Sequence, residues 1–136
     1  MGTDENDPTA QTDVSAFTQT LADLGWTDGR NVRIDVRRYG GDTDRIRAFT
    51  QELVGLQPDI IVVCQSTATV ALQRETRTIP IVFASVPDPV ASGIVARLDR
   101  PSGNVTGFAV LEASLAGKWL ELLSEIAPGL KFCALI

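Results

Sequence analysis

The chain alternates between segments in which apolar residues recur with the period of a helix and segments in which they recur with the period of a strand. In the first helical segment, from Thr9 to Leu24, the apolar side chains fall on one face, and Gly25 follows. That face consists of Val14, Phe17, Leu21 and Leu24. A stripe of this kind predicts an amphipathic helix, and glycine is common just past a helix end.

The next segment, from Asn31 to Tyr39, has a period of two. Val32, Ile34 and Val36 alternate there with charged residues. This alternation is typical of a strand with one covered face, and it favours a place near the edge of a sheet. The glycine pair at positions 40 and 41 is expected to end the strand.

A second helix is predicted to begin after Asp42, whose carboxylate suits the cap position. Its apolar stripe consists of Ile46, Phe49, Leu53 and Leu56. Pro58 is expected to end this helix, because a residue that precedes proline disfavours the helical conformation. The apolar run from Asp59 to Cys64 then predicts a strand that is covered on both faces.

Five further elements are predicted in the rest of the chain. They are a helix at Thr67–Glu75, a strand at Ile79–Ala84, a short strand at Asn104–Phe108, a helix at Ala113–Ile126 and a strand at Lys131–Ile136. Strand and helix alternate throughout, so the predicted fold class is α/β. We expect a three-layer sandwich around a mainly parallel sheet with right-handed crossovers, of flavodoxin-like or Rossmann-like topology.

The composition fits one soluble domain, with 136 residues of which 44% are hydrophobic and 21% charged. A net charge of -5 argues against nucleic acid and anionic membrane as partners, because both attract surfaces rich in lysine and arginine. No segment approaches the roughly 20 apolar residues of a membrane span, and the polar, acidic amino terminus is unlike a signal peptide. The chain is therefore expected either to be cytosolic or to lack its leader.

The chain contains no histidine, which removes Ser-His and Cys-His couples and most zinc sites. The glycine patterns of phosphate-binding loops are also absent. Accordingly, the sequence predicts no catalytic residue, no metal ligand and no cofactor. Cys64 and Cys133 each lie in an apolar run and are predicted to be buried free thiols; a disulfide or a reactive pair is the alternative.

Polar residues gather where the predicted parallel strands end. The carboxyl ends of such strands converge on one crevice, so we expect the segments 37–42, 65–69 and 85–88 to be neighbours. Ser66 and Thr67 stand at a strand-to-helix corner, where their hydroxyls and the free N–H groups of the helix suit a carboxylate or another anion. The alternative is that the hydroxyls cap the helix, and both roles are compatible.

Acidic residues supply the other candidates. Asp88 lies between two prolines and is suited to face an ammonium group, although a plain turn is the more frequent explanation of such a sequence. Glu5 and Asp7 are candidates for entering the crevice from the first loop, with solvated acids as the alternative. Asp42 and Asp44 lack the acid ladder of a calcium loop and are interpreted as a helix start.

Three stretches carry a family resemblance: "LADLGWTDGRNVRIDV", "TIPIVFASVPDPVASGIVARLDRPSGNVTGF" and "KWLELLSEIAPGLK". In wording and order they resemble the substrate-binding proteins of ABC transporters, tryptophan/tyrosine-type, over essentially the whole chain. The resemblance implies a two-lobed type I periplasmic-binding fold that closes on a ligand by hinge motion. It also implies solute capture, such as of an aromatic amino acid, for a membrane permease, without chemistry and outside the cytoplasm. By position, the ligand-binding residues would be Glu5, Gln65, Ser66, Thr67 and Asp88.

The chain departs from the family pattern at both ends, because it lacks a leader, an apolar first strand and the second lobe. We therefore expect residues 1–130 to be an N-terminal lobe without its first strand, and residues 131–136 to start the crossover to the second lobe. The vacant central strand position would expose backbone groups. Lys131–Ile136 is expected to fill it, in the same chain or in a strand-swapped homodimer.

Two other classes of function share this type of fold. An effector-sensing domain of a transcription regulator would need a DNA-binding segment, and a helix-turn-helix encoded upstream would favour it over a leader peptide. An enzyme on a flavodoxin-like fold is disfavoured by the absence of histidine and of a phosphate loop.

Overall fold

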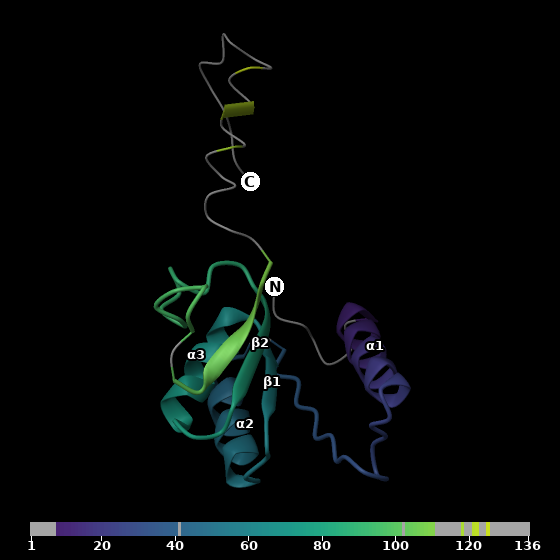
Figure 1. The fold of residues 1–136 in the computed structure, drawn as a ribbon. Helices are drawn as coiled ribbons and strands as arrows, with labels where there is room; N and C mark the ends of the chain where they lie inside the picture. The colour runs from purple at the N-terminus through teal and green to yellow at the C-terminus, as the bar shows by residue number, and fades with distance from the viewer. Residues whose placement is uncertain are drawn as a thin grey trace. The chain divides into compact units, whose positions relative to one another are not determined.

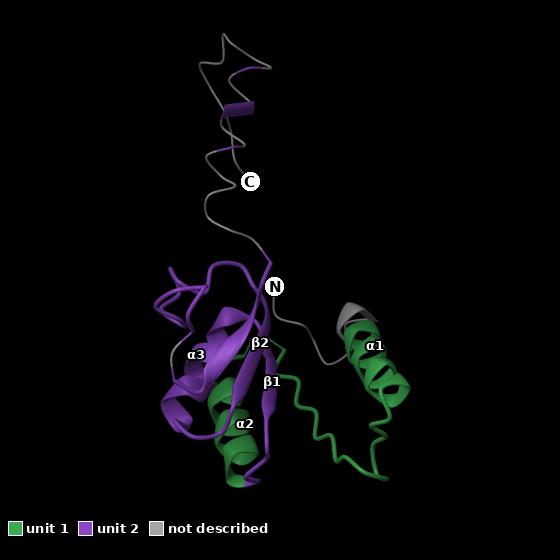
Figure 2. Ribbon diagram, in the orientation of Figure 1, with its two compact units in different colours: residues 1–55 green, residues 56–136 purple. Residues whose placement is uncertain are grey.

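The computed structural model of the protein describes residues 8–40, 42–101 and 103–110, together with 118, 121, 122 and 125. The chain divides into two compact units, residues 1–55 and 56–136, which are coloured separately in Figure 2. Figure 1 labels helices and strands where there is room, and its colour runs from purple at the N-terminus to yellow at the C-terminus.

The first unit begins with helix α1, Pro8–Asp23, which confirms the predicted helix to within one residue at each end. The helix closes with a glycine-dependent arrangement of backbone hydrogen bonds. The Gly25 N–H donates to Ala22 O at 2.9 Å and the Trp26 N–H donates to Leu21 O at 2.8 Å. With Gly25 at a φ of 92°, this is the Schellman motif, in which a left-handed residue lets the last carbonyls of the helix find donors.

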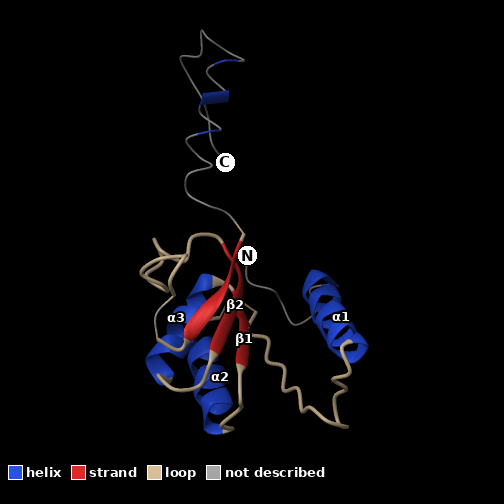
Figure 3. Cartoon of the chain, in the orientation of Figure 1, coloured by secondary structure: helices blue, strands red, loops and turns tan. Residues whose placement is uncertain are grey.

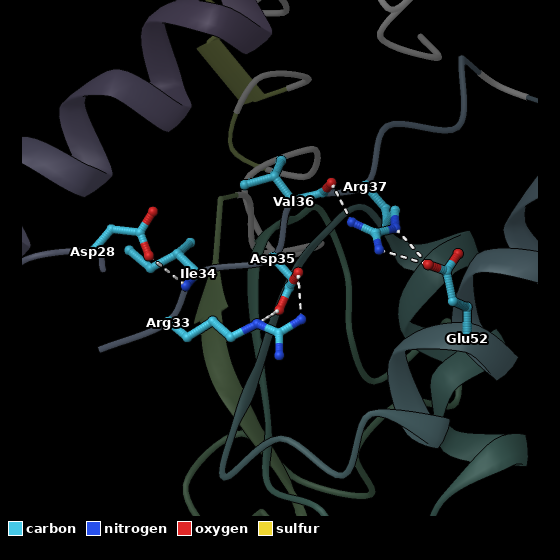
Figure 4. A network of polar contacts seen from close by, with 7 residues as sticks. All are labelled: Asp28, Arg33, Ile34, Asp35, Val36, Arg37 and Glu52. Atoms are coloured by element: carbon cyan, nitrogen blue, oxygen red, sulfur yellow. Dashed lines mark hydrogen bonds and ion pairs between the residues drawn. The ribbon is translucent and has the colours of Figure 1, made fainter. Parts of the chain in front are cut away.

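A turn held by side chains follows α1. The Asn31 Nδ2 donates to Gly25 O at 2.8 Å, and the Asn31 Oδ1 accepts from the Thr27 N–H at 2.8 Å. The Asp28 Oδ1 accepts from the Ile34 N–H at 2.9 Å (Figure 4). Polar side chains thus replace strand pairing in organising this part of the first unit.

The strand predicted at Asn31–Tyr39 is not formed as a paired strand. Within the described residues, its ladder is reduced to one isolated bridge between Asp28 and Val32. The prediction was wrong because alternation specifies only which faces the side chains occupy. A strand also needs a neighbour to receive its backbone hydrogen bonds, and that neighbour is a long-range property.

Helix α2, Thr43–Gly55, confirms the second predicted helix and its cap. The Asp42 Oδ1 accepts from the Asp44 N–H at 2.9 Å and from the Arg45 N–H at 3.5 Å. Ile46 is buried, and the Arg45 guanidinium lies 5.4 Å from the centre of the Phe49 ring. A cap and a cation–π contact therefore stabilise the first half of this helix.

The second unit contains a three-stranded parallel sheet, which confirms the α/β class with a parallel sheet (Figure 3). The strands are β1, Ile61–Cys64; β2, Ile81–Val86; and β3, Val105–Ala109, in the order β1-β2-β3. Ile81, in the central strand, pairs with Ile61 of β1 on one side and with Val105 of β3 on the other. All three of these side chains are buried.

Helix α3, Ser66–Glu75, packs on β1 and β2 and buries Ala68, Thr69 and Leu72. On β1, Ile61 and Val63 are buried, whereas Val62 is 46% exposed and Cys64 is exposed. The expectations of a strand covered on both faces and of a buried Cys64 were therefore wrong for this unit. Successive side chains of a strand point to opposite faces, and α3 covers one of them. Cys64 is a free thiol, as predicted.

The connection from β2 to β3 runs through residues 87–104 with no helix assigned in its described part. It is nevertheless ordered by its own hydrogen bonds. Pro89 O accepts from the Ile94 N–H at 2.9 Å and from the Val95 N–H at 3.1 Å, and both of those side chains are buried. The Gln73 Nε2 of α3 donates to Ile94 O at 2.8 Å, which ties the loop to the helix.

Several expectations lie outside the described residues. They are the strand at residues 131–136, most of the helix at 113–126, the boundary after residue 130 and the state of Cys133. Among the described residues, no helix combines the length and the hydropathy that a membrane crossing requires.

Candidate functional site

The corner between β1 and α3 is built around a strained residue. Gln65 occupies the N-cap position of α3 with φ 81° and ψ 146°, a region that costs a non-glycine residue about 1–3 kcal/mol. Its backbone is held from both sides. The Gln65 N–H donates to Ala84 O at 3.4 Å, and Gln65 O accepts from the Thr69 N–H at 3.2 Å and from the Thr69 Oγ1 at 2.7 Å.

Ser66 and Thr67 do not cap α3, so the capping interpretation was wrong. They are the first two helical residues, and the cap position belongs to Gln65, which makes no side-chain cap bond. A capping hydroxyl must precede the helix to reach the free N–H groups of its first turn. Within the described part of the chain, neither the Ser66 nor the Thr67 hydroxyl has a hydrogen-bond partner.

Helix α3 therefore begins without a side-chain cap, and its first backbone N–H groups are available as hydrogen-bond donors. The first N–H groups of a helix have no partner within it, and they lie at the positive end of its dipole. At α3 these groups stand beside two unbonded hydroxyls, of which Ser66 is half-buried and Thr67 exposed. Chemically, this arrangement can receive a carboxylate or another small anion.

The end of β2 adjoins this corner. Cys64 pairs with Ala84 in the parallel register, so Gln65 lies beside the last residues of β2, just before the loop that begins at Pro87. Ser85 has a φ of 57°, and the register between β2 and β3 shifts between Phe83 and Val86. Two non-glycine residues with positive φ, Gln65 just after β1 and Ser85 near the end of β2, thus lie at the same edge of the sheet.

Asp88 lies in the loop after β2 and closes a turn. Its Oδ1 accepts from the Ala91 N–H at 2.9 Å, and its backbone oxygen accepts from the Ser92 N–H at 3.0 Å. This is the turn considered as the alternative role for this residue. The side chain is half-buried, and its second carboxylate oxygen has no partner within the described residues.

The structure therefore brings together two of the three segments that were expected to converge. The corner at 65–67 and the loop at 85–88 follow paired strands of the second unit. The segment 37–42 belongs to the first unit, where the Asp42 carboxylate is used to cap α2. Glu5 and Asp7 lie outside the described residues.

Sequence reasoning missed the positive φ angles of Gln65 and Ser85. Neither residue type marks such a conformation, because glycine and asparagine are the usual occupants. The weak signal was the abrupt change from the apolar run of β1 to polar residues at position 65.

Four charged residues of the first unit form two ion pairs (Figure 4). The Arg37 Nη2 lies 2.6 Å from the Glu52 Oε1, and the Arg33 Nε lies 2.8 Å from the Asp35 Oδ2. The hydrogen bond from Arg37 lowers the pKa of Glu52 below its ordinary value, and the same bond raises the pKa of Arg37. These carboxylates are thus engaged in structural pairs. Within the described residues, no group of three acidic or cysteine side chains is arranged to hold a metal ion.

Comparison with known proteins gives a family match over nearly the whole chain. A family model described as "ABC transporter substrate binding protein" matches residues 6–136. A curated relative, the tyrosine-binding protein of Clostridioides difficile, is 31% identical over 115 residues. That alignment covers 85% of this chain and 33% of the relative, so the chain spans about a third of the length of the curated protein it matches.

Solved structures are similar as well. A ligand-free, open structure of a substrate binding protein with adhesive properties from Clostridium difficile matches with a TM-score of 0.74 and 30% identity, over 90% of this chain and 41% of that one. A conserved domain protein from Vibrio cholerae matches with a TM-score of 0.73 and 32% identity, over 86% and 39%. An ABC domain from Streptococcus pneumonia in complex with L-Trp matches with a TM-score of 0.69 and 28% identity, over 75% and 34%.

Proposed function

This chain belongs to the ABC transporter substrate binding protein family, and from that premise we propose that it forms one lobe of the site in which such a protein captures an amino-acid-like solute. The observation that carries the proposal is the corner between β1 and α3. There, an uncapped helix start, two unbonded hydroxyls and a strained backbone meet at the carboxyl end of a parallel sheet. Open α/β sheets bind ligands at this edge.

The proposed ligand is an aromatic amino acid. Its carboxylate would accept hydrogen bonds from the first N–H groups of α3 and from the Ser66 and Thr67 hydroxyls. Its ammonium group would face the carboxylate oxygen of Asp88 that has no partner within the described residues. Gln65 and Glu5 complete the proposed set. Two similar proteins support this class of ligand, since one is named for tyrosine and the other was solved with L-Trp.

The proposed role is capture and delivery without chemistry on the ligand. A complete binding protein of this kind encloses its solute between two lobes and presents it to a membrane permease outside the cytoplasm. We propose that residues 1–130 form the N-terminal lobe and that residues 131–136 begin the crossover to the second one. The family match favours this role over effector sensing in a transcription regulator, which has a similar fold.

Thermal unfolding with and without ligand tests the proposal. A ligand at 100 times its dissociation constant adds about 2.7 kcal/mol to the free energy of unfolding. We expect L-Trp or L-Tyr to raise the melting temperature of a two-lobed protein that contains this chain. This chain alone should shift less, because it supplies only part of the enclosing surface.

A double variant locates the ligand. Ser66→Ala with Thr67→Ala should abolish most of the shift, since it removes both hydroxyls at the corner. Thr78→Ala with Thr106→Ala removes two exposed hydroxyls elsewhere in the second unit and should leave the shift intact. An unchanged shift in the corner variant would remove this site from the proposal, and no shift with any amino acid would remove the ligand class.

We also propose that residues 131–136 fill the vacant central strand position beside β1, in the same chain or in a partner chain. Within the described sheet β1 is an edge strand, and its sequence IVVC has no charge, proline or bulge to protect that edge. In the register that sets Cys133 opposite Cys64, the two Cα atoms would come within the roughly 4.4–6.8 Å that a disulfide needs. Mild oxidation of the chain should then yield a Cys64–Cys133 disulfide, within a monomer if the strand adds in the same chain and within a dimer if it is swapped. Free thiols after oxidation would contradict the pairing.

A further inference from the structure

The second unit contains a groove that the proposed capture site does not use. It lies along the second half of α3, the loop between β2 and β3, and the start of β3, and it encloses about 800 Å³. Helix residues Gln73 and Arg74 line it. Because a helix rises about 1.5 Å per residue, Arg74 is about 12 Å along α3 from the corner at Ser66.

The floor of the groove is apolar and firmly held. Ile94, Val95 and Val105 line it and are 3%, 5% and 4% exposed. The walls are fixed by side-chain amides. The Gln73 Nε2 donates to Ile94 O at 2.8 Å, and the Asn104 Nδ2 donates to Ile79 O at 2.6 Å. Each amide therefore secures the backbone of a neighbouring segment, and the cavity is largely preformed.

The charge at the rim is positive and unbalanced. Arg74 and Arg77 line the groove, and neither guanidinium has a hydrogen bond or an ion pair within the described part of the chain. No acidic residue is among the described lining residues. Arg33, Arg37 and Arg97 each pair with a carboxylate, and Arg74 and Arg77 differ from the other unpaired arginines in lining one groove together. In a chain with a net charge of -5, two arginines left without acids at one groove favour an external anion.

We propose that this groove binds a small organic anion, a carboxylate carried on an apolar body. Guanidinium groups bind carboxylates through two parallel hydrogen bonds, which Arg74 and Arg77 are placed to provide at the rim. The apolar body would lie on Val70 and Val90, which line the groove and are not buried. A volume of this size, in which apolar side chains lie beside polar ones such as Gln73 and Asn104, is that of a small-molecule site. The inference is independent of the proposed capture site, which lies at the other end of α3.

A pair of matched probes tests the assignment on the whole chain. 4-Phenylbutyrate and its neutral amide have the same apolar body and differ in charge. In titrations followed by the backbone amide resonances, the carboxylate should shift Ile94, Val95 and Val105 saturably, and the amide should bind about tenfold more weakly, since charge-assisted hydrogen bonds are the stronger kind. Equal binding of the two probes would overturn the proposal.

Charge variants supply the second control. Arg74→Gln with Arg77→Gln should weaken carboxylate binding about tenfold. Arg30→Gln with Arg47→Gln removes the same charge from two exposed arginines of the first unit and should leave the affinity unchanged. Equal losses in the two double variants would show a general charge effect and overturn the site. Shifts confined to residues 65–67 would assign the carboxylate to the capture site and leave the groove without a ligand.

Discussion

Gly107 is the residue that lets β3 lie against β2. A Cβ atom at this position would meet the carbonyl oxygen and the ring of Phe83. The carbonyl belongs to the backbone of the neighbouring strand, so it cannot move aside without disturbing the register that pairs Phe83 with Gly107.

Gly107→Ala should therefore lower the free energy of unfolding by about 1–3 kcal/mol, the usual cost of overpacking. Urea denaturation followed by circular dichroism measures the loss. Gly55→Ala is the matched control, because a Cβ there has nothing within 4 Å and lies at a helix end. A Gly107→Ala protein as stable as the parent would mean that the two strands are further apart in solution.

The Arg37–Glu52 pair predicts a dependence of stability on pH. The pKa of Glu52 is lowered in the folded protein, so the pair stabilises the fold above the ordinary carboxyl value of about 4.3 and this stabilisation is lost as pH falls through the lowered value. Glu52→Gln should reduce the melting temperature at about pH 7 and make little difference at about pH 2. Since Glu52 is 48% exposed, the effect should be modest and should shrink in salt.

Asp59→Asn provides the comparison for that pH series, because Asp59 is exposed and has no hydrogen bond or ion pair within the described residues. Its melting curves should follow the parent at every pH. A Glu52→Gln variant that also follows the parent at neutral pH would show that the ion pair contributes no stability.

The strained backbone of Gln65 predicts that a substitution can stabilise the protein. Glycine adopts its backbone angles without strain, so Gln65→Gly should raise the free energy of unfolding by about 1 kcal/mol. Ser85→Gly should gain less, because a φ of 57° lies in the milder left-handed helical region. Thermal unfolding measures both variants. A loss of stability in Gln65→Gly would instead show that the glutamine side chain holds the corner together.

At the scale of the elements, sequence patterns were most accurate for helices. The first two predicted helices coincide with α1 and α2 to within a residue or two, because an apolar stripe and a cap are local properties. The segment from Asn31 to Tyr39 shows the limit. Its alternation was correctly read, but strand formation depends on a distant partner that the pattern does not contain.

The end of α1 predicts a substitution that acts on one element. Gly25→Ala places a Cβ at a φ of 92° and should destabilise the Schellman motif by about 1 kcal/mol. Gly25→Asn should recover part of the loss, since asparagine tolerates positive φ better than alanine. Amide hydrogen exchange at Trp26, whose N–H bonds to Leu21 O, reports the opening of the motif. Equal protection in all three proteins would contradict the role of Gly25.

At the scale of the whole molecule, the sequence predicted which segments of the second unit converge but not the local structure of the corner they form. The convergence of residues 65–67 and 85–88 follows from parallel topology and was predictable. That Ser66 and Thr67 do not cap α3 was not predictable. The cap position depends on the residue at which α3 begins, and a shift of one residue changes it. The groove lined by Arg74 and Arg77 was also not predictable from the hydrophobic pattern, because the loop between β2 and β3 forms one of its walls.

That same loop bears on the order in which the sheet assembles. Between β1 and β2 the chain passes through α3, whose local hydrogen bonds form early and bring the two strands together. Residues 87–104, which connect β2 to β3, contain no helix in their described part. We therefore expect β3 to pair with β2 after the folding transition state. Leu72→Ala should then slow folding, whereas Val105→Ala should mainly speed unfolding, in stopped-flow measurements. A Val105→Ala variant that slows folding as much as Leu72→Ala would place β3 in the nucleus.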